Sequence, residues 1–131
     1  MNNSLLFKTL QESSIFHGER NDCTVKALAI AGGLTYGVAH TMLAKRGRKF
    51  CKGAYTRDVI SALTELGKTI EYVTEHASFK NIKTIKSLKM LNLKACYLIT
   101  TAQHILTMKD GVIHDWTNER LHRIKEIYRV L

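Results

Sequence analysis

Cys23 occupies a position where a thiol could act as a nucleophile. The stretch GERNDCTVKALAIAGG, residues 18–33, turns from polar to apolar at Cys23, which predicts a helix that begins there and ends at Gly32-Gly33. At the first turn of a helix, unpaired backbone N–H groups and the positive end of the helix dipole stabilise a thiolate. The same N–H groups could hold the oxyanion that forms when a thiolate attacks a carbonyl group.

A cysteine nucleophile needs a base, and His104 stands out among the six histidines of the chain. It begins the segment HILTMKDGVIHDW, residues 104–116, in which Asp110-Gly111 is a strong signal for a β-hairpin turn. The same segment carries Asp115, and an acid close to the imidazole can orient it and stabilise its cation. His104 and Asp115 are therefore the candidate base and acid.

The register of this hairpin predicts how the two side chains meet. If Lys109 pairs with Val112 across the turn, Asp115 falls opposite Leu106. Positions 104 and 106 share a face of the strand, so Asp115 is a diagonal neighbour of His104, within side-chain reach.

Two neighbours of Asp115 are candidates for roles of their own. In the ideal register His114 points to the opposite face and is the weaker partner for the base. Trp116 follows the acid and could pack over the pair, which would limit water, or it could belong to the core alone.

These motifs resemble those of papain-like cysteine peptidases. An NDC helix start, later helices, a strand and the HILTMKDGVIHDW hairpin are similar to small papain-like proteins of tailed bacteriophages. The order of cysteine, histidine and aspartate is also that of bacteriocin-processing peptidases. The resemblance covers residues 20–36 and 97–118. It implies a thiol hydrolase that cleaves a peptide or isopeptide bond in the cytoplasm of a phage host, with Cys23 as nucleophile, His104 as base and Asp115 as orienting acid.

Three residues are candidates for completing the oxyanion hole. Papain-like peptidases commonly carry a glutamine in the loop before the cysteine, and His17 takes that place here. Asn21 and Gln103 are the alternatives, and Asn21 or Asp22 could instead cap the helix.

The remaining cysteines do not suggest a metal site or a redox motif. The chain has three cysteines and no CxxC pair, so neither a zinc knuckle nor a thioredoxin motif is expected, and no cofactor is expected either. We interpret Cys51 and Cys96 as small buried hydrophobic residues, although Cys51 lies in a basic loop where it could be exposed and reactive.

The first half of the chain predicts helices that would position Cys23. Residues 5–10 could form a short strand or a turn of helix, and residues 11–22 are interpreted as a loop. After the helix that begins at Cys23, Thr35 and Thr56 are expected to cap two further helices, which end near Gly47 and Gly67.

The second half predicts the sheet that would position His104. Strands are expected over 69–75 and 95–101, before the hairpin, and a short basic amphipathic helix over 81–91. Residues 120–131 fit a helix or a strand, and we favour a strand that joins the sheet. Helices followed by an antiparallel sheet make an α+β domain, papain-like by the resemblance, over residues 1–131.

Composition limits the class of protein. The chain has 131 residues, 45% of them hydrophobic and 24% charged, which suits one globular domain with a real core. No apolar run approaches the ~20 residues that a membrane span needs. The first residues lack the features of a signal peptide, so the expected location is the cytoplasm, with no membrane partner.

The net charge of +9 favours an acidic partner. The densest basic segment is KRGRKFCK, residues 45–52, in which Arg46, Arg48 and Lys49 are the candidate partner-binding residues. Besides a peptide or protein substrate, this leaves a second hypothesis: a catalytically silent module that binds and inhibits an acidic host protein or nucleic acid. Nucleic acid is not favoured, because no recognisable binding signature is present. The oligomeric state is left open.

Overall fold

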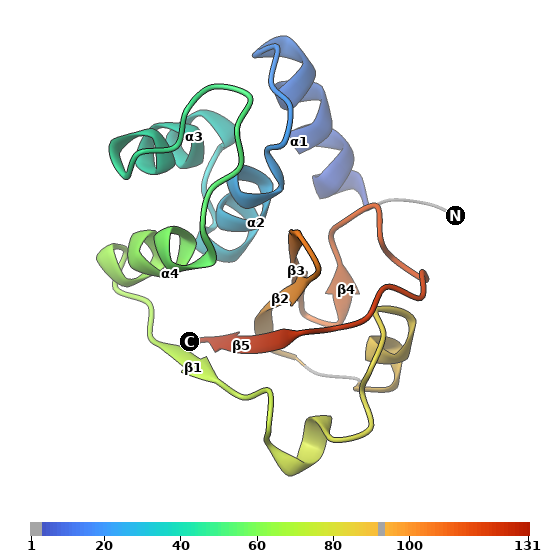
Figure 1. The fold of residues 1–131 in the computed structure, drawn as a ribbon. Coiled ribbons are helices and arrows are strands. Elements are labelled where there is room, and N and C mark those ends of the chain that lie inside the picture. The colour runs from blue at the N-terminus through green and yellow to red at the C-terminus, as the bar shows by residue number, and fades with distance from the viewer. Residues whose placement is uncertain (1–3, 92–93) are drawn as a thin grey trace.

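The protein is described here by a computed structural model, which covers residues 4–91 and 94–131. Its helical half comes first (Figure 1). The helices are α1 (Leu5–Phe16), α2 (Cys23–Gly32), α3 (Tyr36–Lys45) and α4 (Thr56–Glu65). They are followed by β1 (Ile70–Tyr72), the 3-10 helices η1 (Ala77–Phe79) and η2 (Lys86–Leu91), β2 (Cys96–Thr101), β3 (His104–Lys109), β4 (Val112–Ile113) and β5 (Glu126–Val130). The predicted α+β order, helices and then an antiparallel sheet, is confirmed.

The sheet has the order β1-β5-β2-β3-β4, and every neighbouring pair is antiparallel. The C-terminal segment therefore forms a strand, as we favoured, and that strand is inserted between β1 and β2. Its backbone is paired on both sides, for example Tyr128 with Tyr72 and with Leu98. In this central position the apolar side chains of β5 are buried on both faces of the sheet, which favours a strand although their spacing also fits a helix.

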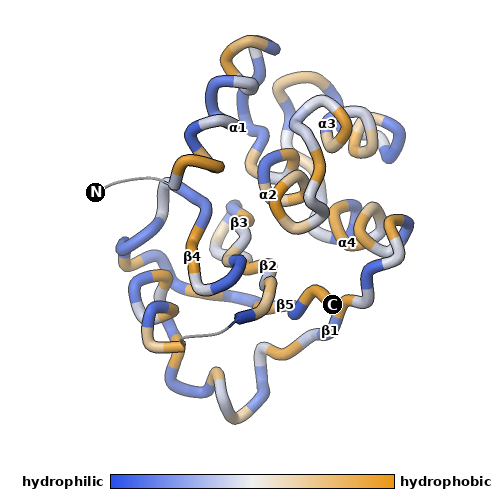
Figure 2. The backbone as a smooth tube through the Cα atoms, turned by 180° about the vertical axis from the view of Figure 1, so that it is seen from behind, coloured by the Kyte–Doolittle hydropathy of each residue, from blue (hydrophilic) through white to orange (hydrophobic). Residues whose placement is uncertain are grey.

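Apolar side chains cover both faces of the sheet. Along β2, Leu98 packs with the helices, whereas Tyr97 and Ile99 point to the other face. On the helix side α2 is central, with α1, α3 and α4 around it and β3 against it, as Figures 1 and 2 show from opposite sides. The segment between β1 and β2 covers the opposite face with Phe79, Ile82, Ile85 and Leu88.

Small residues let α2 approach β3 closely. Ala27, Ala29 and Ala31 are all buried. The Thr107 hydroxyl of β3 donates a hydrogen bond of 2.9 Å to the Ala27 carbonyl. At the other end of α2, Gly33 adopts a left-handed conformation (φ 65°), which is the predicted helix end. α2 is thus fixed both to the sheet and at its C-terminus.

The first helix, α1, is longer than the sequence predicts. Residues 5–10 are helical, which is one of the two forms expected. The loop expected over 11–22 is confirmed for residues 17–22 and wrong for residues 11–16, because α1 continues to Phe16. Ser4 caps α1, and Phe7 and Leu10 are buried, whereas Ile15 and Phe16 are exposed and hide the amphipathic pattern.

Thr35 caps α3 as expected, since its hydroxyl accepts the Val38 N–H at 3.2 Å. The cap predicted at Thr56 is wrong by one residue. Tyr55 holds the N-cap position, and Thr56 is the first residue of α4.

The amphipathic helix predicted over 81–91 is only partly helical. Its backbone pairs with the chain before β5 instead: Ile85 donates to the His122 carbonyl at 3.1 Å and Lys86 to the Arg120 carbonyl at 2.9 Å. These bonds prevent an α-helical ladder, and only the short 3-10 helix η2 forms. The apolar residues still serve the expected purpose, because Ile85 is fully buried against the sheet. The strand predicted over 69–75 shortens to β1.

Within residues 4–91 and 94–131, no single helix is both long enough and apolar enough to cross a membrane. α2 and α3 reach that length and composition only as a pair bent by 115°.

Candidate active site

Cys23 is the first residue of α2, as predicted. Asp22 holds the N-cap position, but its side chain makes no capping hydrogen bond with the helix. Its carboxylate instead accepts the Tyr36 hydroxyl proton at 2.6 Å and lies 3.2 Å from the Lys26 ammonium. The first N–H groups of α2 are therefore left without a side-chain cap from this residue, next to the sulfur atom.

His104 and Asp115 are held together at the open end of the β3–β4 hairpin. The His104 Nε2 and the Asp115 Oδ2 lie 2.7 Å apart. Asp115 is buried and also accepts the hydroxyl and backbone N–H of Thr117, at 2.6 and 3.2 Å. These bonds fix the carboxylate, so that it can in turn fix the imidazole.

The hairpin register explains this contact only in part. Lys109 pairs with Val112 as predicted, but β4 ends at Ile113 and does not continue to the level of His104. After His114 donates its N–H to Thr107, the chain turns, and Asp115 reaches His104 from that turn. The His114 side chain is hydrogen-bonded to Ser4 and does not line the cleft described below.

Cys23 and His104 lie in the same cleft wall, close enough for each side chain to shift the pKa of the other. Because Nε2 is bonded to Asp115, Nδ1 is the ring nitrogen left for the sulfur. Burial opposes the charge on His104, but hydrogen bonds to Asp115 and Cys23 outweigh it and raise its pKa to about 9. Burial likewise opposes a thiolate, yet hydrogen bonds from His104 and the Ile105 N–H lower the pKa of Cys23. Both shifts favour a thiolate–imidazolium pair.

Trp116 covers the imidazole. Its ring centroid lies 5.2 Å from that of His104, at an interplanar angle of 48°. On the other side it contacts the His122 ring and the Arg120 guanidinium. Of the two positions weighed for this residue, the one over the pair is the one observed, and it shields the hydrogen bond to Asp115 from water.

A cleft of about 610 Å³ opens over these side chains. The start of α2 and the segment before α4 line it on the helical side, and the ends of β2 and β3, Trp116 and the start of β5 line it on the sheet side. Cys23, His104 and Asp115 all contribute to its wall. The cleft thus provides a surface on which a substrate could meet the thiol.

Two of the three oxyanion candidates line this cleft. Asn21 and Gln103 both do so, and both have a left-handed backbone, with φ of 52° and 60°. The Asn21 amide already donates one hydrogen bond, to the Cys51 carbonyl at 3.1 Å. His17 is not brought to the cleft: its Nδ1 bonds to the Ser13 carbonyl, and its ring stacks on His40.

The basic segment does not form the surface that the sequence suggested. Arg48 is buried, with two hydrogen bonds of 3.0 Å to Glu19, so its charge does not face a partner. Arg46 lies between α3 and α4 and pairs with Glu65 at 3.2 Å, and Lys49 alone of the three candidates is exposed.

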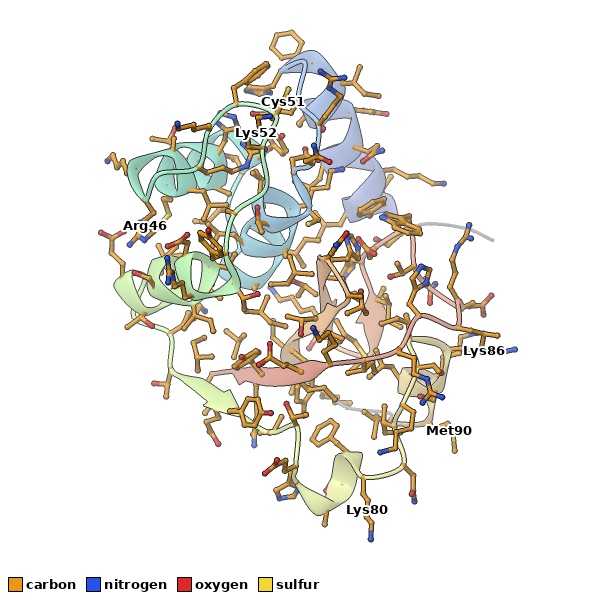
Figure 3. The ribbon with its side chains drawn as sticks, viewed as in Figure 1. Arg46, Cys51, Lys52, Lys80, Lys86 and Met90 are labelled. Atoms are coloured by element: carbon orange, nitrogen blue, oxygen red, sulfur yellow. The ribbon has the colours of Figure 1, made fainter. Side chains whose placement is uncertain are left out.

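The labelled basic residues lie in two separate regions of the molecule. Figure 3 shows Lys52 near the C-terminal end of α1, whereas Lys80 and Lys86 lie at the opposite end of the molecule. No single basic face gathers them.

Sequence reasoning missed Glu19, a buried carboxylate in the loop before Cys23. It accepts both Arg48 hydrogen bonds, the Cys51 N–H at 2.9 Å and the His40 Nε2 at 2.5 Å. The Arg48 hydrogen bonds are the main reason that its pKa falls to about 2. Glu19 ties the loop before α2 to the loop after α3. No local pattern marks a pair 29 residues apart.

Within the described residues, no group of three or more histidine, cysteine, aspartate or glutamate side chains is arranged to hold a metal ion. No protein-family model matches the chain, and no curated protein or solved structure matches it significantly.

Proposed function

We propose that this chain is a papain-like thiol hydrolase that cleaves a peptide or isopeptide bond. The observation that supports it best is the meeting of three side chains in one cleft: Asp115 is hydrogen-bonded to His104, and Cys23 lies beside that imidazole at an uncapped helix start. A nucleophile, a base and an orienting acid are the parts that acyl transfer requires.

In the first step the Cys23 thiolate attacks the carbonyl carbon of the scissile bond. A C–S bond forms, and the π electrons move to the carbonyl oxygen. The backbone N–H groups at the start of α2 stabilise this oxyanion, with the side-chain amide of Gln103 or Asn21 as a further donor.

In the second step the tetrahedral intermediate collapses. The C–N bond breaks, and the His104 imidazolium gives its proton to the leaving amine. Cys23 is left as a thioester with the acyl part of the substrate. Asp115 stays ionised throughout and holds the ring in place.

In the third step water attacks the thioester, and His104, now neutral, takes the proton from that water. The C–S bond breaks, which releases a carboxylic acid and regenerates the Cys23 thiolate. Because a thiolate nucleophile must stay reduced, we place this reaction in the cytoplasm.

Turnover of peptide and isopeptide libraries, followed by mass spectrometry, tests the proposal. Cys23→Ala and His104→Ala are expected to abolish cleavage, whereas the matched variant Cys51→Ala retains it. Cleavage that survives in Cys23→Ala, or its absence with every substrate in the unaltered protein, would contradict the proposal.

A second candidate is a non-catalytic module that binds an acidic protein. The observation that favours it is Phe50, which is 61% exposed and stands between the exposed cations Lys49 and Lys52. In that case Lys49→Glu abolishes binding to the acidic protein, and Cys23→Ala leaves that binding intact. The reverse pattern supports the hydrolase.

A further inference from the structure

The carboxylates at the cleft wall are already engaged by the protein itself. Asp22 is held by the Tyr36 hydroxyl at 2.6 Å and by Lys26 at 3.2 Å, and Asp115 is held by His104 at 2.7 Å. Their negative charges are therefore largely compensated and offer little to a cationic ligand.

Glu126, the third carboxylate of the cleft, is held by hydroxyl groups and has no cationic partner within the described residues, so its negative charge is not compensated. It accepts the Tyr128 hydroxyl at 2.9 Å and the Thr100 hydroxyl at 3.3 Å. Its neighbour Lys125 also lines the cleft and is exposed. Among residues 4–91 and 94–131, no carboxylate lies within ion-pair distance of the Lys125 ammonium.

Two aromatic residues on opposite walls each carry an exposed arginine. On the helical side, the Arg57 guanidinium lies 4.6 Å from the ring centroid of Tyr55. On the sheet side, the Arg120 guanidinium lies 5.6 Å from that of Trp116. Both aromatic rings line the cleft. In the part of the chain that the structure describes, neither guanidinium has a carboxylate partner.

We infer that the cleft selects an acidic peptide segment, whose carboxylates meet Lys125 in the cleft wall and, next to the cleft, the Arg57 and Arg120 guanidinium groups held on Tyr55 and Trp116. This inference rests on the proposed function and names its substrate class. Guanidinium groups bind carboxylates through two parallel N–H bonds, and stacking on an aromatic ring holds them ready for that geometry. The net charge of +9 adds long-range attraction for the same substrates.

Binding is measured with the Cys23→Ala protein, so that no cleavage interferes. The probes are a peptide rich in aspartate and glutamate and its twin with asparagine and glutamine at the same positions. Trp116 is the sole tryptophan of the chain and lines the cleft, so its fluorescence reports binding. The acidic peptide is expected to bind more tightly than its twin, and the difference shrinks as salt is added.

Neutral variants locate the contacts. Each single variant, made in the Cys23→Ala protein, is expected to weaken binding of the acidic peptide roughly two- to fivefold. The variants are Arg57→Gln, Arg120→Gln and Lys125→Gln. Lys80→Gln is the matched control, because Lys80 lies at the far end of the molecule (Figure 3). Equal affinity for the two peptides, or losses no larger than that of Lys80→Gln, would overturn the inference.

Turnover by the unaltered protein is followed separately, which keeps the two claims apart. If the acidic peptide binds more tightly than its twin but the unaltered protein cleaves neither, the result contradicts the proposed hydrolase and still supports the acidic-peptide site. Cleavage of both twins at equal kcat/KM overturns the acidic-peptide site and leaves the hydrolase standing.

Discussion

At the scale of single residues, the proposed hydrolysis depends on the charges of Cys23 and His104. The active form carries a thiolate and an imidazolium, which the opposite pKa shifts of the two groups favour. Hydrolysis therefore rises with pH as the thiol ionises and falls as the imidazolium loses its proton, near pH 9. Measuring kcat/KM against pH checks this, and an upper limb near the ordinary histidine pKa of 6.5 would contradict it.

Asp115→Asn is expected to move that upper limb to lower pH. The amide keeps the shape of the side chain but loses the negative charge that helps to raise the pKa of His104. The rate at the optimum falls as well, because an amide orients the imidazole less strictly than a carboxylate does. An unchanged pH profile in this variant would mean that Asp115 does not act on His104.

The raised pKa of His104 also makes the free energy of unfolding depend on pH. The pKa of His104 is raised from 6.5 to about 9, so its contribution to folding is complete below pH 6.5 and is lost as pH rises through about 9. Urea unfolding at a series of pH values measures this. The His104→Ala protein should lack that decline, and the same decline in both proteins would assign it to other groups.

At the scale of elements, the Glu19–Arg48 pair holds the two loops that flank the helical wall of the cleft. Glu19→Gln leaves the buried Arg48 charge without its partner, and we expect a loss of ~3–5 kcal/mol in the free energy of unfolding. Glu65→Gln is the matched control. It breaks the more exposed pair with Arg46, which is worth about 0–1 kcal/mol. Equal losses in the two variants would contradict the structural role of Glu19.

The pKa of Glu19 gives this pair a pH signature. It is lowered to about 2 from 4.5, so the stabilisation is present above pH 4.5 and is lost as pH falls toward 2.

The contact between α2 and β3 brings the helix that begins at Cys23 against the strand that begins at His104. Thr107→Val removes the buried hydrogen bond to Ala27, with an expected loss of about 1 kcal/mol in the free energy of unfolding. Thr64→Val removes a hydroxyl that bonds to the Ile60 carbonyl on an exposed helix face, and should change stability by less than about 0.5 kcal/mol. Denaturant titration compares the two, and a larger loss in Thr64→Val would count against the buried contact.

Local signals predicted most of the elements and singled out three residues that the structure brings into one cleft. A polar-to-apolar switch placed Cys23 at a helix start, and Asp110-Gly111 placed the hairpin that carries His104 and Asp115. The predictions that were wrong concern residues whose contacts lie far away in the sequence. The segment over 81–91 is prevented from becoming an α-helix by backbone bonds to residues before β5. Arg48 is not part of the expected basic surface, because its hydrogen bonds to Glu19 hold it in the interior.

At the scale of the whole molecule, the site is assembled from both halves of the chain. The helical half supplies Cys23 and one wall of the cleft, and the sheet supplies His104, Asp115 and the other wall. Because the halves meet through the α2–β3 contact, the geometry of the site depends on the complete fold. The sequence could suggest the three residues, but their distances depend on this packing.

The central claim is that His104 activates Cys23, and the pH dependence of Cys23 alkylation by iodoacetamide tests it most directly. Labelling of Cys51→Ala/Cys96→Ala protein isolates the signal of Cys23, since the chain has three cysteines. We predict rapid labelling at near-neutral pH and, after His104→Ala, a midpoint displaced to higher pH with slower labelling below it. Labelling that is unchanged by His104→Ala, with the midpoint of an ordinary thiol in both proteins, would contradict the account.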